Sequence, residues 1–195
     1  YPVMKAANPR VNVVFGGIAY DFFTDTDPDI PANNGPFVRR FFEDALANGA
    51  GSYFDIMNYH FYPLFGVNWT DDYLMDGPSL VKKTEAVRAL MTKYGVDKPI
   101  IITEMGWHNN AMYPYGSDVL QVRMVVQLYA QSIVAGIPMA TWWPLSDLGG
   151  AFLQDSGLVT TIIDGSPPVR KPAYSAFQVL TREFANVRFV KRIIE

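Results

Sequence analysis

Four short apolar runs divide the chain at regular intervals. Each run is rich in β-branched or aromatic residues and is flanked by glycine or proline, which is typical of strands buried on both faces. The runs cover residues 11–15, 54–59, 99–103 and 139–143. We therefore predict four strands of one parallel sheet.

Apolar residues at helical spacing follow each run. The predicted helices begin at serine or proline and end at glycine, as helix termini favour. These termini are Pro36 and Gly49, Ser79 and Gly95, Ser117 and Gly136, and, for the start of the last helix, Pro172. The alternating order of strands and helices predicts right-handed crossovers between parallel strands.

The connections from strand to helix are long, whereas those from helix to strand are short. The long loops therefore lie at the carboxyl ends of the strands. These ends form the functional face of β/α barrels and open α/β sheets. No glycine-rich phosphate loop follows a strand, which argues against a nucleotide-binding, doubly wound fold. We predict an α/β fold of four parallel β/α units, which is half of a TIM (β/α)8 barrel.

A half-barrel needs a complement, because a complete barrel takes about 250 residues and four strands alone leave two unpaired edges. We expect a fragment of a longer barrel, a partner that carries the missing N-terminal half-barrel, or a second copy that closes the ring as a homodimer. Residues 1–185 are assigned to the C-terminal half-barrel. Residues 187–194 alternate apolar and polar side chains, so 186–195 are a candidate start of an accessory β segment.

Composition narrows the classes of function. Of the 195 residues, 49% are hydrophobic and 14% aromatic, which is enough to form the core of one domain. The net charge is −3 with no basic run, so nucleic acid is not an expected partner. No apolar stretch approaches the roughly 18 residues that span a membrane. The chain has no cysteine, which leaves its compartment open, with a secreted or extracellular location slightly favoured.

Glu104 is the strongest candidate for a catalytic group. It directly follows the apolar run 100–103, where a carboxylate is costly unless it is paired or hydrogen-bonded. This position is the carboxyl end of a predicted strand, where such barrels keep their catalytic groups. A glutamate in a strand-terminal salt bridge is the alternative interpretation.

His60 and Tyr62 follow the preceding predicted strand. They are two residues apart, so on an extended chain both side chains project to the same side. An imidazole and a hydroxyl there could hydrogen-bond a carboxylate on the adjacent strand and keep it ionised and oriented. A core histidine bonded to backbone is the alternative interpretation.

Trp142 and Trp143 end the last predicted strand. Alternation places one indole toward the barrel interior and the other toward the helices. An aromatic ring at the barrel mouth offers an apolar face to a sugar, although two core tryptophans remain an alternative.

Together, residues 103–107 (TEMGW), 60–62 (HFY) and 142–143 (WW) resemble the motifs of clan-A glycoside hydrolases, which are retaining enzymes on a (β/α)8 barrel. The resemblance implies that Glu104 is the nucleophile that ends strand seven. It implies that His60 and Tyr62 position this carboxylate and tune its pKa. It also implies that Trp143, with Trp142 second, stacks on the sugar.

Trp107 and Asn109, just beyond the nucleophile, are expected to line the sugar subsites. The resemblance implies no metal and no organic cofactor. The expected activity is hydrolysis of O-glycosyl bonds in an oligo- or polysaccharide, and neither the sugar nor the anomeric configuration follows from the sequence.

One part of the clan pattern is missing. The acid/base of the clan is a glutamate that follows asparagine, and this chain contains no Asn-Glu pair. Retaining hydrolysis needs two carboxyl groups about 5–5.5 Å apart. Asp21 and Asp147 are the possible substitutes, but neither occupies the expected position. We therefore expect this chain to supply only the nucleophile half of an active site and to be inactive or very weak alone.

Two other classes of function remain open. One is a non-catalytic carbohydrate-binding half-barrel, and the other is a structural or assembly module whose aromatic residues serve only as core.

Overall fold

The computed structural model describes residues 1–19, 35–63, 80–112, 116–149, 155–161 and 165–191. Three strands and five α-helices, with one 3₁₀ turn, are assigned within these residues. In chain order they are α1 (Pro2–Ala7), α2 (Gly35–Ala47), η2 (Ala50–Ser52), β1 (Met57–Phe61), α3 (Leu80–Lys93), β2 (Ile100–Met105), α4 (Asp118–Val134), β3 (Ala140–Trp142) and α5 (Pro172–Glu183).

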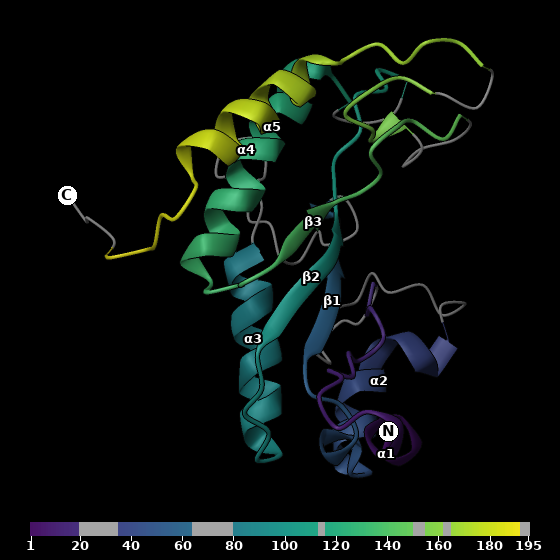
Figure 1. Ribbon diagram of the computed structural model, residues 1–195, viewed down its shortest axis with the longest axis vertical. Coiled ribbons are helices and arrows are strands. Elements are labelled where there is room, and N and C mark those ends of the chain that lie inside the picture. The colour runs from purple at the N-terminus through teal and green to yellow at the C-terminus, as the bar shows by residue number, and fades with distance from the viewer. Residues whose placement is uncertain (20–34, 64–79, 113–115, 150–154, 162–164, 192–195) are drawn as a thin grey trace.

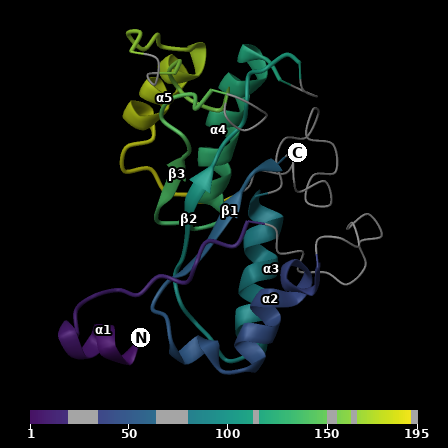
Figure 2. The ribbon, with the colours of Figure 1, turned by 90° about the vertical axis from the view of Figure 1, so that its right-hand side faces the viewer.

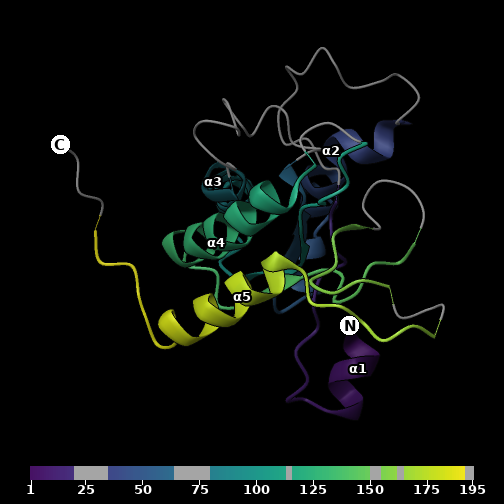
Figure 3. The same ribbon diagram turned by 90° about the horizontal axis from the view of Figure 1, so that it is seen from above.

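The three strands form one parallel sheet in the order β1-β2-β3. Figure 1 shows α3, α4 and α5 together on one side of this sheet, and the view from above in Figure 3 agrees. Each strand is joined to the next by a crossover that contains a helix, as parallel strands require. The predicted alternation of strands and helices is therefore present from β1 to α5.

The predicted strand over residues 11–15 is not assigned as a strand. The segment does run parallel to β1, through isolated bridges from Val14 to Ile56 and from Ile18 to Tyr59. Gly16 and Gly17 lie between the two bridges, and glycine weakens strand pairing because it adds no side chain to the sheet. Within the described residues, three strands are thus assigned with a fourth segment bridged to β1, and four complete β/α units stay a prediction.

Local sequence explains where the helices begin and end. The Ser117 hydroxyl accepts the backbone N–H of Leu120 at 3.1 Å and so caps α4. Pro172 opens α5 at a position where its missing N–H costs nothing. Gly95 and Gly136 follow α3 and α4 with φ of 70° and 66°, a conformation that favours glycine. The predicted cap Ser79 lies outside the described residues.

Helix α1 was not expected from the apolar pattern, and none of its residues is buried. It lies near the end of the sheet at which the strands begin, apart from α3, α4 and α5 (Figure 2). Tyr1 Oη and Lys5 Nζ both contact the carboxylate of Asp55, which stands just before β1. Polar contacts therefore hold this helix in place.

The hydrophobic core lies between the sheet and the helices. On β1 the side chain of Tyr59 is fully buried, and its hydroxyl is 2.7 Å from Thr84 Oγ1 of α3. Tyr59 and its alternate neighbours therefore face the helices. The largest fully buried side chains include Trp107, Tyr59, Phe42, Phe54, Phe61, Met57, Leu80, Ile100, Ile102, Met105, Met124 and Leu128.

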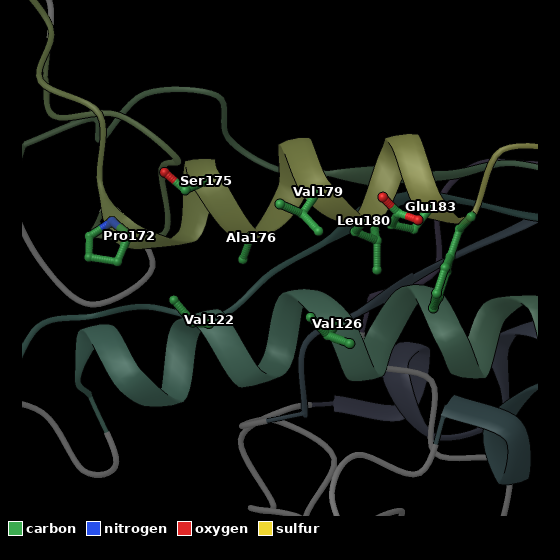
Figure 4. Close-up of a pocket in the computed structure, with 9 residues that line it drawn as sticks. Val122, Val126, Pro172, Ser175, Ala176, Val179, Leu180 and Glu183 are labelled. Carbon is green, nitrogen blue, oxygen red and sulfur yellow. The ribbon is translucent and has the colours of Figure 1, made fainter.

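An apolar groove of about 700 Å³ lies between α4 and α5 (Figure 4). Val122 and Val126 line it from α4, and Ala176, Val179 and Leu180 line it from α5. None of the residues that line the groove is a predicted site residue.

Residues 187–191 form neither helix nor strand, and 192–195 lie outside the described residues. The accessory β segment therefore stays a prediction. Among the described residues, no helix has both the length and the apolar character needed to cross a bilayer.

Candidate active site

A β-bulge in β2 shapes the candidate site. The pairing of β1 with β2 runs from Tyr59 opposite Ile102 to His60 opposite Glu104, so Thr103 is an extra residue in β2. A bulge re-aims the side chains around it. Thr103 and Glu104 consequently both contact His60, although consecutive residues of a regular strand point to opposite faces.

These side chains project from the face of the sheet opposite the helices, which we call the inner face. Tyr59 contacts α3, so its neighbours Asn58 and His60 must point the other way. The prediction placed Glu104 just after a strand, whereas the structure places it within β2 (Ile100–Met105). The strands are parallel, and the carboxylate of Glu104 meets residues of the inner face.

Two side chains bind one oxygen of Glu104. The hydroxyl of Tyr62 donates to Glu104 Oε2 at 2.8 Å. The Nδ1 atom of His60 lies 3.3 Å from the same oxygen. The carboxylate is thus held by both residues that the sequence singled out, while its side chain stays 32% exposed. This arrangement can orient an ionised carboxylate that remains open on one side.

His60 is also held from its other ring nitrogen. Its Nε2 atom is 3.1 Å from the hydroxyl of Thr103. Burial lowers the pKa of His60 below its usual value, the carboxylate of Glu104 acts to raise it, and the ammonium of Lys83 adds to the lowering. The imidazole is therefore fixed at both nitrogens beside the carboxylate.

The sequence analysis did not single out Asn58, whose side chain holds Thr103 in the site. Its Oδ1 atom accepts the backbone N–H of Thr103 at 3.1 Å and the hydroxyl of Thr103 at 3.0 Å. Asn58 is 4% exposed. Its signal in the sequence was weak, because one asparagine in an apolar run has many interpretations until its partner strand is known.

Two glycines make room for the site. A Cβ atom at Gly17 would lie 2.0 Å from His60 Nε2, so the backbone beside β1 packs directly against the imidazole. A Cβ atom at Gly106 would lie 2.6 Å from the carbonyl oxygen of Trp143 and 3.4 Å from Cε1 of Tyr62. Neither requirement is visible in the sequence, since each depends on a residue far along the chain.

Trp142, the last residue of β3, and Trp143, which follows it, occupy different environments. Trp142 is 7% exposed, and its Nε1 donates to the carbonyl of Ser156 at 2.8 Å. Trp143 is half-buried, and its backbone N–H donates to the carbonyl of Met105, the residue after Glu104. The peptide bond from Trp143 to Pro144 is cis. Trp143 is thus the less buried of the two, and its role in sugar binding stays a prediction.

Trp107 and Asn109, which follow β2, each contact a neighbour of their own. Trp107 is 1% exposed and stacks on the ring of His108, with centroids 5.7 Å apart. Asn109 donates from Nδ2 to Asp118 Oδ1 at 2.7 Å. The burial of Trp107 gives no support to a direct contact with sugar, and both subsite assignments stay predictions.

Asp147 has a structural partner. Both oxygens of its carboxylate accept from Lys171 Nζ, at 2.7 and 2.9 Å, and Oδ1 also accepts the backbone N–H of Gly157. Burial raises the pKa of Asp147, and Lys171 opposes the rise. This carboxylate is thus engaged with Lys171 and Gly157, and the expectation that it does not replace the acid/base stays a prediction. Asp21 lies outside the described residues.

No cluster of three or more His, Asp or Glu side chains in the described part of the chain is arranged to hold a metal ion. The groups that the described residues bring together here are one carboxylate, one phenol and one imidazole.

Comparisons with known proteins show which folds this chain resembles. No protein-family model and no curated protein matches the chain. Among solved structures, the chain is similar over 100% of its length to a family 39 glycoside hydrolase from Bacteroides cellulosilyticus WH2, with 20% identity and a TM-score of 0.64. The match covers 38% of that chain.

Two further structures are similar at lower scores. The alpha-L-arabinofuranosidase of Thermotoga maritima matches 93% of this chain and 33% of its own, with 19% identity and a TM-score of 0.51. An FMN-binding beta-glucuronidase from Facaelibacterium prausnitzii L2-6 matches 92% of this chain and 24% of its own, with 18% identity and a TM-score of 0.51.

The chain thus spans less than two fifths of the length of each of these three structures. At such low identity the likeness shows the fold alone, which is part of a TIM-barrel-like fold. The structural neighbours are glycoside hydrolases.

Proposed function

We propose that this chain supplies the nucleophile half of the active site of a retaining glycoside hydrolase. The observation that carries the proposal is the double contact of Glu104 Oε2 with Tyr62 at 2.8 Å and with His60 at 3.3 Å. A salt bridge to lysine or arginine would make Glu104 a structural residue. Instead, its contacts are two groups that orient a carboxylate and leave it partly exposed.

In the proposed reaction, Glu104 attacks the anomeric carbon of the sugar while the bond to the leaving oxygen breaks. A second carboxylic acid gives its proton to that oxygen, and a covalent glycosyl ester on Glu104 results. Water then attacks the same carbon, releases Glu104 and gives a proton to the second carboxylate. Both contacts described above fall on Oε2, so Oε1 is the attacking oxygen in this proposal. Trp143 stacks on the sugar bound at the site.

The second carboxyl group is proposed to come from outside residues 1–195. This chain has no Asn-Glu pair, and Asp147 is engaged with Lys171. A missing N-terminal half-barrel would supply the acid/base, and residues 1–195 alone would then be inactive. A second copy of residues 1–195 would close the ring but would bring no Asn-Glu pair. The molecular mass of the native protein in solution distinguishes a single long chain from a homodimer.

The first test replaces Glu104 with glutamine in the full-length protein. Aryl glycosides of several sugars serve as substrates, including an α-L-arabinofuranoside and a β-D-glucuronide because two structural neighbours are named for these. Removal of a nucleophile lowers kcat by about 10⁴- to 10⁶-fold. We expect a loss of this order for Glu104→Gln, and a loss of roughly 10- to 100-fold for Tyr62→Phe, which removes one hydrogen bond to a charged group.

The matched control is Glu85→Gln, which changes an exposed carboxylate on α3. Its activity should equal that of the unchanged protein. A 2-deoxy-2-fluoro glycoside with a good leaving group should label Glu104, as seen by mass spectrometry of peptides. Undiminished hydrolysis by Glu104→Gln, or a label on another residue, would reject the proposal.

A further inference from the structure

A directed chain of hydrogen bonds runs from Asn58 through Thr103 to His60, whose Nδ1 atom lies 3.3 Å from Glu104 Oε2. It begins with the amide of Asn58, whose orientation is fixed by a backbone group. The N–H of Thr103 is a donor and lies 3.1 Å from the amide atom facing it, so this atom must be the oxygen Oδ1. The chain therefore starts from an acceptor that cannot be exchanged for the amide nitrogen.

The same oxygen fixes the hydroxyl of Thr103. Oδ1 of Asn58 has no hydrogen to give, so the hydroxyl at 3.0 Å must donate to it. The Thr103 hydroxyl has one hydrogen, and this hydrogen is donated to Asn58 Oδ1. Toward His60 Nε2, at 3.1 Å, Thr103 Oγ1 can then only accept. The Nε2 atom of His60 must consequently carry a hydrogen.

The hydrogen on Nε2 determines the state of the other ring nitrogen of His60, Nδ1. A neutral imidazole with its hydrogen on Nε2 has a lone pair and no hydrogen at Nδ1, and this atom lies 3.3 Å from Glu104 Oε2. Two acceptors at that distance repel unless a proton lies between them. We infer that Asn58 is a positioning residue that acts through Thr103 to hold His60 in the Nε2–H form, so that His60 Nδ1 and Glu104 share one proton.

The surroundings of His60 are consistent with a proton at this position. On β2 the charged group that faces the ring is Glu104, and from α3 the ammonium of Lys83 donates to the carbonyl of His60 at 3.2 Å. Tyr62 donates to the same carboxylate oxygen, and Gly17 packs against the ring edge at Nε2. Burial and Lys83 lower the pKa of His60, while Glu104 favours the protonated ring.

The inference concerns the site of the proposed function, but its test requires no activity. When the shared proton is lost, the neutral ring of His60 has two options. With its hydrogen on Nε2 it keeps the hydrogen bond to Thr103 but its Nδ1 lone pair repels Glu104, and with its hydrogen on Nδ1 it loses the hydrogen bond to Thr103. Removing the hydroxyl in Thr103→Val frees Nε2, so neutral His60 can move its hydrogen to Nδ1 and donate to Glu104. The variant should therefore release the shared proton at lower pH than the unchanged protein.

The experiment is a pH titration of ¹⁵N-histidine in the full-length protein by long-range ¹H–¹⁵N correlation, with His60 assigned through His60→Gln. Residues 1–195 hold two histidines, so His108, buried and stacked on Trp107, is an internal reference. Above its pKa, His60 of the unchanged protein should carry hydrogen on Nε2. In Thr103→Val the hydrogen should be on Nδ1, with the titration midpoint lower by roughly one unit.

Thr103→Ser is the matched control, because it keeps the hydroxyl and should keep both the Nε2–H form and the midpoint. Asn58→Leu should reproduce Thr103→Val, since the freed hydroxyl can donate to Nε2. A neutral His60 with its hydrogen on Nδ1 in the unchanged protein would overturn the inference, whatever the variants do. Loss of hydrolysis in Glu104→Gln bears on the proposed function alone, so the two failures are distinguishable.

Discussion

At the scale of single residues, the site depends on one residue inserted into β2. Without Thr103 in the bulge, a regular strand would place Glu104 and its predecessor on opposite faces. With it, one imidazole reaches both side chains, at 3.1 Å and 3.3 Å. A single extra residue thus determines which groups surround the candidate nucleophile.

Asp55 shows how another carboxylate is tuned far from the site. The ammonium of Lys5, followed by the backbone N–H of Val13, lowers the pKa of Asp55 from 3.8 to about 2. Because the folded-state pKa is the lower one, the ionised form favours folding. This contribution is present above the unfolded-state pKa and is lost as the pH falls through about 2.

We therefore expect Asp55→Asn to be less stable than the unchanged protein at neutral pH, with a gap that narrows between about pH 4 and pH 2. Urea unfolding followed by circular dichroism at several pH values measures the gap. Asp44→Asn, at an exposed position on α2, is the control. A gap that stays constant down to pH 2 would show that the Lys5 contact does not perturb Asp55.

At the scale of elements, local signals set the ends of the helices. The clearest case is α4, where the hydroxyl of Ser117 accepts the N–H of Leu120. Replacing an N-cap serine by alanine costs about 1 kcal/mol. We expect Ser117→Ala to lose about that much free energy of unfolding, measured by urea titration.

Ser117→Asp is the matched variant for this cap. Its carboxylate can accept the same N–H and is favoured by the positive end of the helix dipole. It should match the unchanged protein in stability. Equal losses for the alanine and aspartate variants would mean that the hydroxyl contributes through some contact other than the cap.

At the scale of the whole molecule, a buried ion pair joins the segment after β3 to the start of α5. Lys171 Nζ binds both oxygens of Asp147 and the carbonyl of Asp155. The side chains of Lys171 and Asp147 are only 6% and 13% exposed. The pair joins the start of α5 to the segment that follows β3.

Removing one partner leaves the other charge buried, which costs roughly 3–5 kcal/mol. We expect Lys171→Met to lose free energy of unfolding in that range. The double variant Lys171→Met with Asp147→Asn should recover part of the loss, since the amide keeps an acceptor for Gly157 and carries no charge. Denaturant unfolding of the unchanged protein, Lys171→Met, Asp147→Asn and the double variant completes a double-mutant cycle. A double variant no more stable than Lys171→Met would assign the loss to packing instead of charge.

The open edges of the sheet also belong to this scale. In the described part of the chain, the sheet ends at β3 on one side, and residues 11–18 form only isolated bridges on the other. An unpaired strand edge invites further pairing. This is the structural support for the proposal that another half-barrel, or a second copy, completes the ring.

The sequence by itself determined those helix ends and strands that depend only on residues close by in the chain. Ser117, Pro172, Gly95 and Gly136 mark the helix ends, and the apolar runs around Ile102 and Tyr59 indicate buried parallel strands. Spacing along one strand was also enough to place His60 and Tyr62 on one side. These features depend on neighbours within a few residues, which the sequence displays directly.

Only the tertiary structure decided how the strands align. The bulge at Thr103, the amide of Asn58, the space that Gly17 leaves for His60 and the pairing of Asp147 with Lys171 join residues far apart in the chain. Register between strands is set by hydrogen bonds to a partner, and one extra residue changes which side chains meet. The local sequence was therefore enough to single out Glu104 as the candidate nucleophile. The residues that hydrogen-bond around it could be identified only from the tertiary structure.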